Sequence, residues 1–139
     1  MDIKEFAEKF IKAEDEAWQT GNCNALEKLE DPKVVYHNPP MPDVIGWEGH
    51  MQYILGMRQT VSDLHQDWEY ITGDGNVFSL SYKMRAISKG MIPGTQNGKE
   101  ITNNSLFVFK LKGGKIIEAW ANGSMTGIDL EAASKAMKK

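Results

Sequence analysis

The first half of the chain carries apolar residues at helical spacing. Asp2 with Glu5 three residues later predicts a helix start, and Gly21 predicts its left-handed end. Between these signals one helical stripe collects Ile3, Phe6, Ala7, Phe10, Ile11, Ala17 and Trp18. A short second helix is predicted from Asn24, and a third from about Trp47 to Val61.

The second half changes to a period of two, which is typical of strands. A short strand is already predicted at 34–36, ended by the turn Asn38-Pro39-Pro40. Four further strands are predicted at 68–72, 78–86, 101–112 and 115–122, and a final helix at 128–137. This order predicts an α+β fold with the helices on one face of an antiparallel sheet.

Length and composition bound the class of protein. The 139 residues predict a single domain spanning 1–139, long enough for one core, and 41% hydrophobic with 25% charged residues is ordinary for a globular chain. A net charge of -3 argues against nucleic acid as a partner. No run approaches the ~18 apolar residues of a membrane span, and no signal peptide is evident, so we expect a cytoplasmic protein without a membrane partner.

Four segments carry a family resemblance: residues 36–40 (Tyr-His-Asn-Pro-Pro), Gly46, Asp63-Leu64, and the run from Gly114 to Trp120. In this order and spacing, from about 6 to 130, the chain resembles SnoaL-like proteins, which are related to polyketide cyclases, in the nuclear transport factor 2-like superfamily. The resemblance implies a cone-shaped, curved antiparallel or mixed sheet of cystatin-like topology, wrapped around a long N-terminal helix.

The same resemblance speaks against the aldol cyclase reaction. It aligns the cyclases' catalytic Asp with Ala121, their partner His with Phe107, and a second acidic position with Ser124. The reaction needs a base beside a carbonyl and an acid for the developing alkoxide, and neither alanine nor phenylalanine can transfer a proton. We therefore expect no turnover of a polyketide aldol substrate above the buffer rate.

A pocket for a small hydrophobic molecule, carbonyl-bearing or aromatic, is the function that the resemblance implies. The strand register that the resemblance implies places these side chains on the inner face of the cone: Asn103, Ser105, Phe107, Phe109, Ile117, Ala119 and Ala121. The predicted ligand-binding residues are Trp18, Tyr36, Tyr53, Arg58, Asn103, Ser105, Phe107, Ala119 and Ala121. The alternative is that these side chains pack the core shut.

The candidate catalytic residues are His37 and Asp63. The pKa of a histidine lies near neutrality, and His37 ends a strand before a rigid turn, although it could instead cap that turn through backbone hydrogen bonds. Arg58 falls on the apolar stripe, where it could bind an anionic or carbonyl ligand, pair with Asp63, or snorkel to water. His50 is expected at the rim, exposed to solvent.

No metal and no cofactor are predicted. The three histidines lack the spacing of a helical metal motif, and the lone Cys23 permits neither a disulfide nor a cysteine-rich zinc site. Two functions stay open: a binding protein without turnover, or an isomerase, lyase or cyclase type of enzyme that transfers protons with relocated acid and base residues.

The opposite register of the last two strands predicts an interface. Leu106, Val108 and Trp120 would form an apolar patch on the outer sheet face, and such patches mark interfaces. We expect a homodimer through this face, as the resemblance also implies. The alternative is a monomer whose patch is covered by the C-terminal helix.

Overall fold

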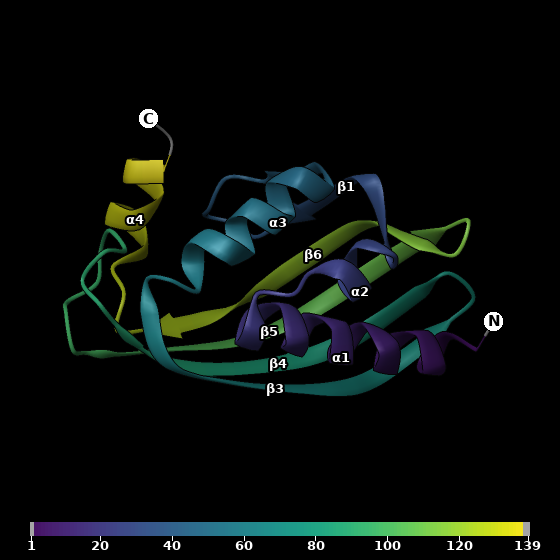
Figure 1. Ribbon diagram of the computed structural model, residues 1–139, viewed down its shortest axis with the longest axis horizontal. Helices are drawn as coiled ribbons and strands as arrows, with labels where there is room; N and C mark the ends of the chain where they lie inside the picture. The colour runs from purple at the N-terminus through teal and green to yellow at the C-terminus, as the bar shows by residue number, and fades with distance from the viewer. Residues whose placement is uncertain (1, 138–139) are drawn as a thin grey trace.

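A curved six-stranded sheet forms the body of the molecule, in the order β2-β1-β6-β5-β4-β3 (Figure 1). The computed structural model describes residues 2–137. Its strands are β1 (Glu30–His37), β2 (Val44–Ile45), β3 (Val61–Asp74), β4 (Val77–Ser88), β5 (Glu100–Lys112) and β6 (Lys115–Thr126). β1 pairs with β6 in parallel, and the other neighbours are antiparallel. The predicted α+β fold with a mixed, curved sheet is confirmed.

The N-terminal helix α1 (Ile3–Thr20) lies along the sheet over β3 and β4 (Figure 1). The Asp2 side chain accepts a hydrogen bond from the Lys4 amide, and Gly21 ends the helix with a φ of 83°. Both predicted end signals are therefore confirmed. The helix presses Phe10 onto Phe78 and Phe109, all fully buried, and this aromatic group is the centre of the core.

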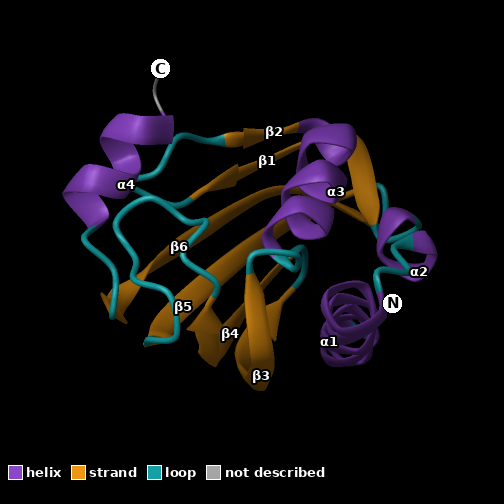
Figure 2. Cartoon of the chain, turned by 60° about the vertical axis from the view of Figure 1, so that its left-hand side comes forward, coloured by secondary structure: helices purple, strands orange, loops and turns teal. Residues whose placement is uncertain are grey.

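Three more helices lie within residues 2–137 (Figure 2): α2 (Asn24–Glu27), α3 (Gly46–Met57) and α4 (Leu130–Met137). The prediction that the third helix reaches Val61 is wrong. The Thr60 hydroxyl donates a hydrogen bond to the Met57 carbonyl, which closes the last turn. Val61 instead begins β3 and pairs with Ser88 of β4. The branched side chain of Val61 suits a strand.

The register of β5 and β6 sets which side chains face inward. On β5, the predicted inward register from Asn103 to Phe109 is confirmed, with Phe109 fully buried. On β6, the prediction for Ile117 is wrong, because the pairing shifts between Lys110 and Leu111. This bulge makes Ile116 the buried residue, and Ala119 and Ala121 then face inward as expected.

The outer sheet face exposes the three residues of the predicted interface. Leu106 is 59% exposed, and Val108 and Trp120 are 40% exposed. The C-terminal helix does not cover them, since α4 places Ala133 and Met137 in the wall of an internal cavity. Within residues 2–137, no helix is both long and apolar enough to cross a membrane.

Candidate functional site

A cavity of about 310 Å³ opens between the inner sheet face, α1, α3 and α4. Its wall is mostly apolar and aromatic, and side chains of the described residues do not fill this space. The aromatic lining residues are Trp18, Tyr36, Tyr53, Trp68, Tyr82 and Phe107. Six methionines also line it: Met41, Met57, Met84, Met91, Met125 and Met137. Unbranched, polarizable methionine side chains can adapt to differently shaped ligands.

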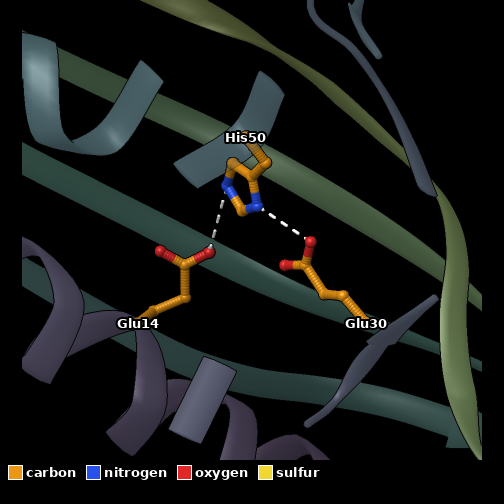
Figure 3. Close-up of side chains that lie close together, drawn as sticks. All are labelled: Glu14, Glu30 and His50. Carbon is orange, nitrogen blue, oxygen red and sulfur yellow. Dashed lines mark hydrogen bonds and ion pairs between the residues drawn. The ribbon is translucent and has the colours of Figure 1, made fainter. Parts of the chain in front are cut away.

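Three charged residues from three different elements meet at this cavity (Figure 3). His50 of α3 lies between Glu14 of α1 and Glu30 of β1, and all three are buried. The His50 Nδ1 nitrogen donates a hydrogen bond to Glu30 Oε1 at 2.9 Å. Its Nε2 nitrogen lies 3.8 Å from Glu14 Oε1. Glu14 and His50 line the cavity, whereas Glu30 lies behind them.

Two aromatic side chains hold the remaining carboxylate oxygens of the cluster. The Trp18 indole N–H donates to Glu14 Oε2 at 2.9 Å, and the Tyr36 hydroxyl donates to Glu30 Oε2 at 2.8 Å. The Tyr36 ring also packs against the His50 imidazole, with centroids 4.2 Å apart. Each carboxylate thus has one oxygen fixed by an aromatic donor and one turned toward His50, so the cluster is oriented before any ligand binds.

Burial raises the pKa of the Glu14 carboxyl from 4.5 to about 7, against the opposing effect of His50. Burial alone would lower the pKa of His50, but the Glu30 and Glu14 carboxylates outweigh it and the pKa of His50 is raised. Burial raises the pKa of Tyr36 well above its usual value, and the nearby Glu30 carboxylate adds to this effect. Glu14 can therefore either donate or accept a proton near neutral pH, which is what general acid and base catalysis requires.

The cluster is also the place where a metal ion would fit among the described residues. One donor atom from each of Glu14, Glu30 and His50 lies within 4.8 Å of the others, a set suited to a divalent cation. The hydrogen bond between His50 and Glu30 and the two aromatic donors already satisfy most of these atoms. These three hydrogen bonds and the imidazole between the two carboxyl groups hold the cluster together.

The expectation that His50 lies exposed at the rim is wrong, since its exposure is 5%. Its spacing could have shown this, because His50 is three residues after Trp47 and four before Ile54, both buried on the same helix face. Glu14 was missed although it stands four residues after Phe10 on the apolar stripe. Glu30 carries no comparable signal, since only the fold brings it to His50.

His37 lies at the cavity wall, at the end of β1. Its Nε2 is 2.6 Å from Glu118 Oε2, and its Nδ1 is 3.0 Å from Asp43 Oδ1. The alternative of a turn capped through backbone hydrogen bonds is thus replaced by a bridge between two carboxylates. The hydrogen bonds that the His37 imidazole makes to Glu118 and, second, to Asp43 raise the pKa of His37. Both ring nitrogens can donate to carboxylates only when the imidazole is protonated.

Arg58 and Asp63 lie outside the cavity lining. Arg58 follows α3, and its Nε and Nη2 atoms donate to the carbonyls of Trp18 and Gln19, each at 3.1 Å. The guanidinium therefore caps the C-terminal end of α1. Asp63 is exposed and accepts a hydrogen bond from the Ser62 hydroxyl. In the described part of the chain no ion pair joins Asp63 to Arg58, so neither residue serves the predicted pairing.

The other predicted pocket residues divide into two groups. Those that line the cavity are Trp18, Tyr36, Tyr53, Asn103, Phe107 and Ala121. Ser105 and Ala119 do not line it. Ala119 is fully buried in the core, and the Ser105 hydroxyl donates to the Asn103 side chain.

Comparison with known proteins gives a consistent picture of the fold. The family model of SnoaL-like polyketide cyclases matches residues 8–128. No curated protein sequence matches the chain.

Solved structures with the same fold cover most of this chain. A SnoaL-like protein from Jannaschia sp. CCS1 is 18% identical, with a TM-score of 0.74, over 87% of this chain and 86% of its own. TsrD from Streptomyces laurentii is 18% identical, with a TM-score of 0.74, over 96% of both chains. The epoxide hydrolase/cyclase-like enzyme SalBIII is 15% identical, with a TM-score of 0.70, over 93% and 98%. At these identities the likeness concerns the fold alone.

Proposed function

Because the chain belongs to the SnoaL-like polyketide cyclase family, we propose that it binds a small hydrophobic carbonyl compound in the cavity and transfers a proton to or from it. Glu14 is the proposed acid and base. Ala121 and Phe107 have no titratable group, so the proposed reaction uses Glu14 of α1 instead of a residue on β5 or β6. The fold likeness to SalBIII, an epoxide hydrolase/cyclase-like enzyme with a role in pyran ring formation, supports the proposal.

The observation that carries this proposal is a buried carboxyl group whose pKa is about 7 and which faces an apolar cavity. Burying a carboxylate destabilises a fold unless the charge is compensated, and Glu14 is held in place by Trp18 and approached by His50. A packed core gains nothing from such a group. General acid–base catalysis benefits from such a carboxyl group, since an efficient acid or base has a pKa close to the operating pH.

The proposed step is an enolisation. The Glu14 carboxylate accepts a proton from the carbon next to the substrate carbonyl, the C–H electron pair forms the enolate double bond, and the carbonyl oxygen takes up the negative charge. The His50–Glu30 pair keeps Glu14 oriented.

Deuterium exchange tests this function without knowledge of the natural substrate. Acetonaphthone in D₂O loses its α-protons in the proton NMR spectrum, and we expect the protein to accelerate this loss. Glu14→Gln should lower the catalysed rate by about 10²–10⁴-fold. Glu16→Gln changes the same charge on the exposed face of α1 and should have no effect. Binding seen by tryptophan fluorescence, with exchange at the buffer rate, would instead establish a binding protein without turnover.

We also propose that the protein is a homodimer through Leu106, Val108 and Trp120. Trp120→Glu should convert it to a monomer, because two buried carboxylates would face each other across the two-fold axis. Asn76→Glu, in the exposed turn between β3 and β4, is the matched control and should leave the dimer intact. Light scattering gives the answer: a mass of 15.6 kDa for the wild type at every concentration rules out the dimer.

A further inference from the structure

Acidic groups outnumber basic ones in the buried cluster beside the cavity. At the floor, the carboxylates of Glu14 and Glu30 face the single imidazole of His50. At the end of β1, His37 lines the cavity, whereas its partners Asp43 and Glu118 lie outside the lining and are partly exposed to solvent. Even when an imidazole is protonated, it balances only one of its two carboxylates. The buried cluster of Glu14, Glu30 and His50 therefore tends toward negative charge once Glu14 is ionised.

Among the described residues, no lysine or arginine side chain offsets this excess of carboxylates. Within the described residues 2–137, neither a lysine nor an arginine lines the cavity. The nearest candidate from the sequence, Arg58, is occupied by the carbonyls of Trp18 and Gln19. The cavity wall thus presents no cation to an anionic ligand except the two histidines, each already paired with carboxylates.

Aromatic rings surround the carboxyl group at the floor. Trp18 hydrogen-bonds to Glu14 and packs edge-on against Tyr53, with ring centroids 6.1 Å apart, and both residues line the cavity. Tyr36 closes the other side above His50. Burial raises the pKa of Tyr53, and the nearby Glu14 carboxylate adds to this effect. Aromatic faces beside a carboxylate form the environment that attracts organic cations.

We propose that the cavity selects its ligand by charge, and that it takes a hydrophobic molecule carrying a cationic nitrogen and rejects carboxylates. The inference rests on the proposed function because it names the substrate class for the same cavity. The ligand's cation lies near Glu14 and the rings of Trp18 and Tyr53. It also favours the ionised form of Glu14, which is the form that accepts a proton.

Three probes of one shape test this proposal: naphthylmethylamine, naphthylmethanol and naphthoate, titrated into the wild-type protein at neutral pH by calorimetry. We expect the amine to bind at least about tenfold more tightly than the alcohol, and the carboxylate at least about tenfold more weakly. The wild-type series needs no variant and so does not depend on how a mutant folds. An alcohol that binds as tightly as the amine, or a carboxylate that binds as tightly as the alcohol, overturns the proposal.

Two variants assign the preference to Glu14. Glu14→Gln should remove most of the advantage of the amine and leave the affinity for the alcohol within about threefold. Glu16→Gln, on the exposed face of the same helix, should keep the full series. An amine preference that survives Glu14→Gln overturns the assignment. Acetonaphthone exchange without an amine preference contradicts the charge selection alone, and an amine preference without exchange contradicts the proton transfer alone.

Discussion

Replacing His50 with leucine is expected to lower the free energy of unfolding by about 3–5 kcal/mol at neutral pH. The substitution leaves the buried Glu14 and Glu30 carboxylates without the imidazole that lies between them. Uncompensated buried charge is among the costliest changes in a protein interior. Urea unfolding followed by circular dichroism measures the loss.

A matched histidine and a double variant make this result specific. His65→Leu, at an exposed position of β3, should change the stability by less than about 0.5 kcal/mol. Adding Glu30→Gln to His50→Leu should recover part of the loss, since one of the two buried charges is then removed. If His50→Leu is as stable as the wild type, the buried cluster is not held by its charges and the account of the site is wrong.

The second large effect is a pH dependence of stability that belongs to Glu14. Its pKa rises from 4.5 to about 7 on folding, so the folded chain binds this proton more tightly than the unfolded chain does. Stability from this group is therefore complete below about pH 4.5 and is lost as the pH rises to about 7. At 1.36 kcal/mol per pKa unit, the loss amounts to about 3 kcal/mol.

The raised pKa of His50 acts in the same direction. Stability from His50 is present below its unfolded pKa and is lost as the pH rises through its folded pKa. Urea unfolding of the wild type and Glu14→Gln across this range isolates the carboxyl group. Above pH 7 the glutamine variant should be the more stable of the two proteins. The difference between their free energies of unfolding should then have shifted by about 3 kcal/mol from its value at acid pH. Parallel curves for the two proteins would show that Glu14 does not titrate as described.

The sequence predicted those parts of the fold that depend on local signals. Asp2 and Gly21 marked the ends of α1 through their own backbone and side-chain chemistry, and alternation along β5 placed Phe107 and Phe109 on the inner face. The errors arose where the pairing between strands, and not the local sequence, decides the structure. Val61 joined β3 because Ser88 of β4 offers it a partner, and the bulge on β6 exchanged Ile117 for Ile116.

The candidate site was less accessible to prediction from sequence. Its aromatic wall was expected in Trp18, Tyr36 and Tyr53, but its charges were not. Glu14 and Glu30 lie on α1 and β1, and only tertiary packing brings them to His50. Pattern alone could have flagged Glu14 and His50, because each interrupts an apolar helix face. The resemblance drew attention to β5 and β6, where the cyclases keep their acid and base, and thus away from α1.

The most direct test of the central claim is the titration of the Glu14 carboxyl group by carbon-13 NMR. The resonance that disappears in Glu14→Gln is Glu14, and its chemical shift against pH gives the pKa. The account predicts a midpoint of about 7. A midpoint near 4.5 would contradict it, because Glu14 would then be an ordinary ionised carboxylate with no proton to exchange at neutral pH.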